Sequence, residues 1–265
     1  MNKGHGFIAP QDDPEDYIFG SQELGFKFPY ETLQDDGQWD SYLPKFEHQA
    51  RNNFETANCT GYGTLNCLEI LLRRKYGVIE DFSERFTGVM ADTWPPGNSP
   101  KKVIDTIRKE AGAIPEELLP FDKSVKTVDE YYSPKPMTGS LLARGLNWLE
   151  NWTVKYEWVF KGNGENKQEL MKEALRQSPL GCSVYAWALD DADGLYFKNG
   201  DDNHWGVIYG FIDGVEWHFF DSYDQSKKRL KWDYDFGFVM KYYIAKEGKR
   251  SNWFIDLFKR ISLWT

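Results

Sequence analysis

One cysteine, one histidine and one aspartate stand in an order and spacing that suit nucleophilic catalysis. Cys59 precedes His204 by 145 residues, and Asp221 follows His204 by 17. A catalytic cysteine needs a thiolate, a histidine that takes its proton and usually a third group that orients the imidazole. The three residues therefore predict acyl transfer through a thioacyl-enzyme, with Cys59 as nucleophile, His204 as base and Asp221 as the orienting group.

The elements expected around these residues would position them for this chemistry. A helical pattern starts within a turn of Cys59, and free backbone N–H groups at a helix N-terminus stabilise a thiolate. His204 opens one predicted strand and Asp221 ends the next, so an antiparallel pair would bring them side by side. Cys67 and Cys182 lie within apolar periods and are expected in the core.

The order of the periodic segments predicts an α+β fold. Helical spacing with caps and stops occurs at residues 59–76, 99–112, 139–151 and 166–177. Short aromatic and β-branched runs, separated by Gly, Asn and Asp, follow at residues 180–189, 205–213, 216–220 and 238–245. Helices thus come first and antiparallel strands later.

Several further motifs resemble those of a known family. They are a glutamate ten residues after Cys59, a later glycine, an aromatic–Ser–Glu element, a histidine strand and a turn that carries the third residue. In this chain they read Glu69, Gly77, Phe82-Ser83-Glu84, Asn203-His204-Trp205-Gly206-Val207 and Asp221-Ser222-Tyr223. Over roughly residues 42–245 the chain is similar to the papain-like (C1-type) cysteine peptidases, as a divergent member for which a phage or bacterial type is one reading.

This resemblance implies a two-lobed papain-like fold and a cysteine peptidase or amidohydrolase acting on peptide or isopeptide bonds. The catalytic domain would span residues 46–248, with a helical N-terminal lobe at about 54–178 and an antiparallel β-sheet C-terminal lobe at about 179–248. An irregular N-terminal arm, 1–45, and a C-terminal amphipathic helix, 249–265, would flank it.

The resemblance also implies an oxyanion donor and a substrate cleft. The Gln49 side chain would donate together with the Cys59 backbone N–H, and Asn53, six residues before the nucleophile, is the alternative donor. Asp221 stands where the family usually has Asn, and either side chain can accept the imidazole N–H. The residues expected at the substrate cleft are Gly97, Cys182, Trp205 and Tyr223.

The composition of the chain limits the classes of partner and cofactor that we expect. A net charge of −9 argues against a nucleic-acid partner, which requires a basic face. Three cysteines and no visible signal peptide favour the cytoplasm, or packaging in a virus or phage particle. No run approaches the ~18 apolar residues of a membrane span, and no Cys and His set has zinc spacing. We expect a protein or peptide substrate and no metal or organic cofactor.

The predicted C-terminal helix has an apolar face, which would pack on the protein's own body or contact a virion or another partner. This face comprises Trp253, Leu257, Phe258, Ile261 and Trp264.

Two alternatives stay open at this level. The residues around Cys59 and the run from His204 to Tyr209 also resemble the two motifs of NlpC/P60-type cell-wall amidases. In addition, Thr60 replaces the tryptophan of the papain-like family, and only Gly97 matches its pair of substrate-binding glycines. These departures allow a catalytically inactive papain-like structural or virion-associated binding module.

Overall fold

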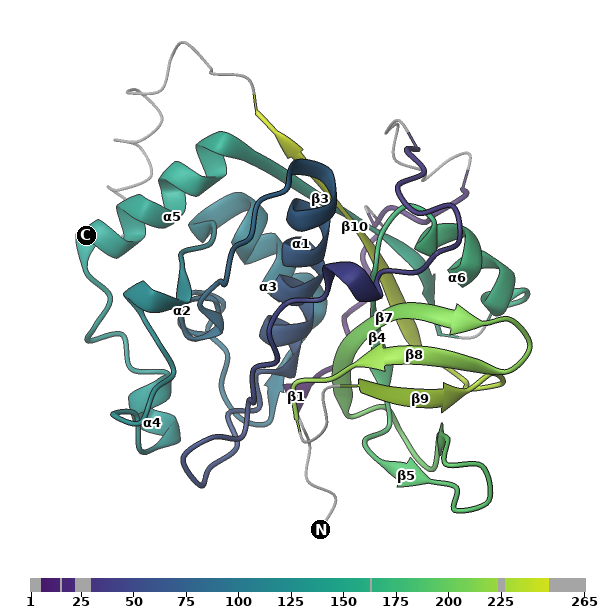
Figure 1. Ribbon diagram of the computed structural model, residues 1–265. Coiled ribbons are helices and arrows are strands. Elements are labelled where there is room, and N and C mark those ends of the chain that lie inside the picture. Colours follow the sequence, from purple (N-terminus) through teal and green to yellow (C-terminus); the bar gives the residue numbers. More distant parts are fainter. Residues whose placement is uncertain (1–5, 15, 22–29, 163, 224–226, 248–265) are drawn as a thin grey trace.

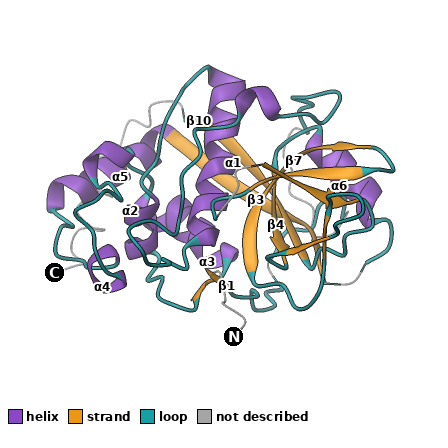
Figure 2. Cartoon of the chain, turned by 60° about the horizontal axis from the view of Figure 1, so that its bottom comes forward, coloured by secondary structure: helices purple, strands orange, loops and turns teal. Residues whose placement is uncertain are grey.

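Helices on one side and a large sheet on the other make up the protein, as Figure 1 shows. The computed structural model describes residues 6–14, 16–21, 30–162, 164–223 and 227–247. Helices α1 to α5 gather on one side, and most of the sheet lies with α6 on the other (Figures 1 and 2). The expected α+β fold is confirmed.

Four of the described helices begin at a capping Ser or Thr side chain. Their bounds are α1 Cys59–Tyr76, α2 Glu84–Met90, α3 Pro100–Thr106, α4 Val128–Tyr131, α5 Gly139–Asn151 and α6 Lys167–Leu175. A Ser or Thr side chain accepts a backbone N–H at the start of α2 to α5, which satisfies donors that have no partner within the helix. α3 continues as a single π-helical segment, Ile107–Ala111. α1 ends at Gly77, whose φ of 63° favours glycine.

The main sheet has eight strands in the order β3-β10-β4-β7-β8-β9-β6-β5. Their bounds are β3 Trp152–Lys161, β4 Leu180–Val184, β5 Ala188–Leu189, β6 Tyr196–Phe197, β7 His204–Ile212, β8 Glu216–Phe220, β9 Lys227–Lys231 and β10 Phe238–Lys246. All pairings are antiparallel except that of β6 with β9. Because β7 and β8 are neighbours, the start of β7 lies beside the end of β8.

Strand β3 departs from the sequence expectation. It lies within the span assigned to the helical lobe, yet it pairs along its whole length with β10. Most of its residues are aromatic or β-branched, which is typical of a strand. However, it follows α5 directly, so no turn residue in the sequence marks where the strand begins. The sheet half therefore begins at residue 152, and α6 packs against it.

The described residues of the N-terminal arm form little regular structure but contribute to the core. The Trp39 side chain is fully buried, and its indole N–H donates to the Leu175 carbonyl at 2.7 Å. A two-residue strand, β1 Gly6–Phe7, pairs in parallel with β2 Gly97–Asn98. The arm is thus fixed at both the core and the junction of the two halves (Figure 1).

The amphipathic helix expected at 249–265 lies outside the described residues. Within the described ranges, no helix combines the length and apolar character that crossing a bilayer would require.

Candidate active site

Cys59 is the first residue of α1, where the expected helix N-terminus is found. The side chain of Asn58, just before it, donates to the Glu84 carbonyl at 2.9 Å and to the Tyr131 hydroxyl at 3.0 Å, which anchors the start of the helix. The Cys59 thiol lies within hydrogen-bonding reach of the backbone N–H groups of Trp205 and Thr60. The nucleophile predicted from sequence therefore adjoins the strand that begins with His204.

His204 and Asp221 form a buried pair. Nε2 of His204 and Oδ1 of Asp221 are 2.6 Å apart, and neither side chain has exposed surface. The Tyr223 ring lies 6.3 Å from the imidazole in an edge-on arrangement, and its backbone N–H donates to Asp221 Oδ1 at 3.2 Å. The Trp187 ring packs on the imidazole at 5.6 Å. These contacts fix the imidazole and keep water from its bond to Asp221.

Lys228 is a member of this network that the sequence reasoning missed. Its ammonium donates to Asp221 Oδ2 at 2.5 Å from a fully buried position, and it lies 4.7 Å from the centre of the Trp187 ring. Burial alone would raise the pKa of Asp221, but the charges and hydrogen bonds of His204 and Lys228 bring it down to about 2. One sequence signal was present: Lys228 shares the inward face of β9 with Leu230.

Gln49, rather than Asn53, is the carboxamide that adjoins the site. Its backbone N–H donates to the Ser222 carbonyl at 2.7 Å, and its side-chain oxygen accepts from the Ser222 hydroxyl at 2.7 Å. Gln49 is fully buried. Asn53 is exposed, with a positive φ of 67°.

The Gln49 amide N–H₂ donates to a carboxylate that was not expected from the sequence. Oε1 of Glu55 accepts from Gln49 Nε2 at 2.6 Å and from the Ala57 backbone N–H at 2.9 Å. Burial raises the pKa of Glu55, although these hydrogen bonds and the nearby His204 lower it in part. A half-buried acid therefore accepts a hydrogen bond from the group that would stabilise an oxyanion.

Burial favours the protonated form of the Cys59 thiol. Burial raises the pKa of Cys59 well above its usual range, and the carboxylates of Glu55 and Asp221 raise it further. The N–H groups of Trp205 and Thr60 act in the opposite direction but do not outweigh burial. Formation of a thiolate is consequently favoured by a base that takes the proton.

Strand β1 crosses the site. The Phe7 backbone N–H donates to the Asn203 carbonyl at 3.4 Å, and its ring stacks on Trp205 at 5.8 Å. Gly6 and Gly97 have φ values of 110° and 138°, and a Cβ on Gly97 would lie 2.0 Å from the Gly6 carbonyl oxygen. Glycine is required at both positions because the two backbones approach so closely.

Strand β1 also packs closely against the segment that leads into α1. A Cβ on Gly6 would lie 2.3 Å from the Ala57 carbonyl oxygen. β1 therefore runs between Gly97 and Asn203 and against Ala57, and Cys59 and His204 have no exposed surface.

The remaining residues expected in the cleft occupy different places. Gly97 faces β1, and Tyr223 packs on His204. The Trp205 ring is buried against Phe7 and Gly63. Cys182 is fully buried in the core, near enough to Cys67 for the two thiols to interact, so its side chain does not line an open cleft in this structure.

A cysteine helix packed on an antiparallel sheet, with the histidine and its acid on adjacent strands, is the papain-like fold of cysteine proteases. Solved structures similar to the chain include the digestive procathepsin L 3 of Tenebrio molitor larval midgut, with a TM-score of 0.60 and 14% identity over 91% of this chain and 76% of that chain.

Two further structures extend the comparison. The Amb a 11 cysteine protease, a major ragweed pollen allergen, in its proform has a TM-score of 0.60 at 16% identity over 95% of this chain and 70% of that chain. The bromelain protease of Ananas comosus has a TM-score of 0.53 at 15% identity over 77% of this chain and 96% of that chain. No family model matches the sequence, and no curated protein matches it. The likeness therefore establishes the fold.

Proposed function

We propose that the protein is a cysteine peptidase that hydrolyses peptide or isopeptide bonds through Cys59, His204 and Asp221. The observation that carries this proposal is the buried His204–Asp221 hydrogen bond of 2.6 Å. His204 begins strand β7, and the backbone N–H of the next residue, Trp205, reaches the Cys59 thiol. The base and its orienting acid are hydrogen-bonded, and the thiol lies beside the residue that follows the base, which supports the arrangement that thiol acyl transfer needs.

In the proposed reaction, the Cys59 sulfur attacks the carbonyl carbon of the substrate while His204 takes the thiol proton. The Cys59 backbone N–H and the Gln49 amide would stabilise the tetrahedral oxyanion. His204 then gives its proton to the leaving amine as the C–N bond breaks. Water, deprotonated by His204, attacks the thioester and restores the free thiol.

We propose further that the N-terminal segment holds the enzyme latent. β1 lies across the cleft against Ala57, Gly97 and Asn203, and a substrate cannot reach a nucleophile that has no exposed surface. Two of the similar structures are proteases in a pro-form, which fits a latent state. Removal or displacement of residues 6–9 would open the cleft.

The test compares the full chain with a variant that lacks residues 1–9, both assayed on a fluorogenic peptide library and with iodoacetamide. The salt bridges of Asp13 to Lys101 and Asp16 to Lys161 remain in the truncated variant. We expect peptide cleavage and rapid alkylation of Cys59 after truncation, and neither when Cys59→Ala is added.

Matched variants Cys67→Ser and Cys182→Ser should retain the activity of the truncated parent. If Cys59 in the folded, truncated variant is alkylated no faster than these two core cysteines, the peptidase proposal is refuted. Release of fragments from peptidoglycan, with no cleavage of peptides, would instead favour the cell-wall amidase alternative.

A further inference from the structure

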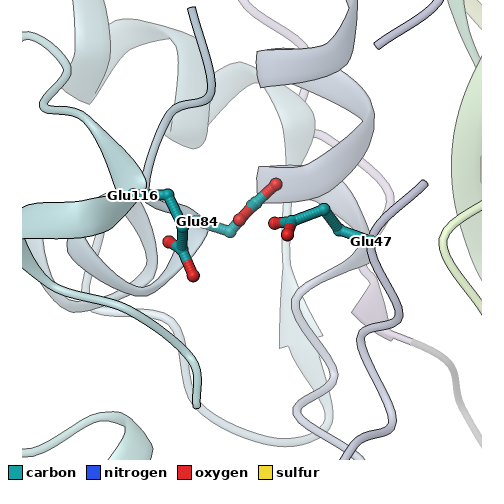
Figure 3. A group of neighbouring side chains, drawn as sticks. All are labelled: Glu47, Glu84 and Glu116. Atoms are coloured by element: carbon teal, nitrogen blue, oxygen red, sulfur yellow. The ribbon is translucent and has the colours of Figure 1, made fainter. Parts of the chain in front are cut away.

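Three glutamates converge away from the catalytic residues. One carboxylate oxygen from each of Glu47, Glu84 and Glu116 lies within 4.8 Å of the others. Figure 3 shows the carboxylates of Glu47 and Glu84 turned toward one another, with that of Glu116 beside them. They come from the segment before Gln49, the first residue of α2 and the short 3₁₀ turn Glu116–Leu118.

Each of the three has a buried oxygen that lacks a donor. Oε1 of Glu47 accepts from Arg51 at 3.0 Å, and Oε1 of Glu116 accepts the Phe121 N–H at 2.8 Å. Within the described ranges, no hydrogen-bond donor reaches Oε2 of Glu47, Glu84 or Glu116, and all three of these atoms are buried. The Glu84 residue itself is only 2% exposed. An ionised carboxylate oxygen buried without a donor or a counter-charge is strongly unfavourable.

The surrounding protein supplies little positive charge. Arg51 pairs with Glu47, and the guanidinium of Arg85 also interacts with Glu116. The carboxylates of Glu47, Glu116 and Glu69 all act on Glu84. When ionised, these three carboxylates together with that of Glu84 outnumber the guanidinium groups of Arg51 and Arg85, so the position keeps a net negative charge. A divalent cation would offset it.

We propose that Glu47, Glu84 and Glu116 bind a divalent cation that prefers oxygen ligands, and that this cation is Ca²⁺. Ca²⁺ takes carboxylate oxygens at about 2.3–2.6 Å, so the largest oxygen–oxygen separation in its coordination sphere is about twice that. The separations of up to 4.8 Å found here fall within this span. The three ligands contain no nitrogen or sulfur, which disfavours Zn²⁺ and Cu²⁺.

Such a cation would add a link between three segments that already share hydrogen bonds, among them Ser83 N–H to the Ile114 carbonyl at 2.9 Å and Arg51 to the Phe121 carbonyl at 2.9 Å. Glu47 lies two residues before Gln49, and Glu84 accepts through its carbonyl from Asn58, the residue before the nucleophile. Glu116 holds the turn that leads to Phe121. The ion would stabilise the helical side of the molecule whether or not the protein is a peptidase.

Protonation of the carboxyl groups is the competing explanation for how the three glutamates can lie so close together. Burial raises the pKa of Glu116 to about 8, and burial raises that of Glu84 well above its usual range, so protonated carboxyls sharing hydrogen bonds would also remove the repulsion. The two explanations differ in a measurable way. Protons make stability independent of calcium, whereas a cation site makes it depend on calcium.

The experiment titrates the EDTA-treated full chain with CaCl₂ by isothermal calorimetry and follows thermal unfolding with and without calcium. We expect one Ca²⁺ per chain and a rise in Tm of about 5 °C at about 100 times the Kd. Glu84→Gln and Glu116→Gln should each weaken binding by at least about tenfold. Glu117→Gln, an exposed neighbour on the same turn, is the matched control and should bind as the parent does.

Wild-type protein that shows neither calcium-dependent heat nor a change in Tm would overturn the proposal in favour of protonated carboxyls. Unchanged affinity in both glutamine variants would also overturn it, because the ion would then lie elsewhere. Should Glu84→Gln fail to fold, Glu116→Gln and the wild-type titration decide the question.

Discussion

Replacement of Lys228 tests how the acid of the candidate triad is held. Lys228 and Asp221 are 2.5 Å apart and both fully buried. Lys228→Met leaves a buried carboxylate whose remaining side-chain partner is His204, and Asp221→Asn leaves a buried ammonium without its carboxylate. Removing one member of a buried pair costs about 3–5 kcal/mol of unfolding free energy. The double variant removes both charges and should recover most of that loss.

The structure gives a scale for the combined effect of His204 and Lys228 on Asp221. The pKa of Asp221 is about 2 against an ordinary value of 3.8, and at 1.36 kcal/mol per tenfold this difference is worth about 2 kcal/mol. Because the folded-state pKa is the lower one, this stabilisation is complete above pH ~4 and is lost as the pH falls toward 2. Measurements at pH 7 therefore capture all of it.

The assay is urea unfolding of four proteins, namely the parent, the two single variants and the double variant, followed by tryptophan fluorescence. We expect a coupling energy of about 2 kcal/mol between the two positions. Lys227→Met is the matched control, because the Lys227–Asp40 ion pair has side chains 53% and 60% exposed and should contribute little. Additive losses at positions 221 and 228 would refute the view that Lys228 compensates Asp221.

Three further outcomes are expected in the truncated, accessible form of the enzyme or in the full chain. Gln49→Ala should lower kcat/KM on a peptide by about 10²–10³ while leaving the alkylation rate of Cys59 nearly unchanged, as stopped-flow labelling would show. Glu55→Gln removes a negative charge near the thiol, so the pH profile of Cys59 alkylation should move to lower pH; a profile that stays in place would contradict the assigned electrostatics. In the full chain, Phe7→Ala removes the ring that holds β1 on the cleft and should speed labelling of Cys59 several-fold but not that of Cys67, by mass spectrometry of the modified peptides.

The parts of the site that sequence could predict are those fixed by local pattern. Cys59 is marked by the helix that follows it, and that helix ends at Gly77 as its spacing indicates. Glu69, expected on the same helix, is buried and accepts the Phe82 N–H at 2.8 Å. His204 begins its strand as predicted. Each of these signals lies within a few residues of the feature it predicts.

The parts that sequence could not predict depend on contacts between distant segments. Lys228 looks like an ordinary strand lysine until β9 pairs with β8 and places it opposite Phe219. Glu55 lies in a loop, and no pattern in the neighbouring sequence predicts that Gln49 donates a hydrogen bond to it. The choice between Gln49 and Asn53 likewise depended on Ser222, 173 residues after Gln49. Burial and charge pairing of this kind become visible only when the chain is folded.

The charges around Cys59 and the position of β1 lead to one expectation about activation. Glu55 engages the Gln49 amide and accepts the Ala57 N–H, and β1 packs against the Ala57 backbone. The segment that carries Glu55 is therefore held in place partly by β1. Departure of β1 would admit substrate, and it would also let Glu55 move away from Gln49. Since Glu55 raises the pKa of Cys59, the same movement would favour the thiolate, so opening of the cleft and activation of the nucleophile should occur together.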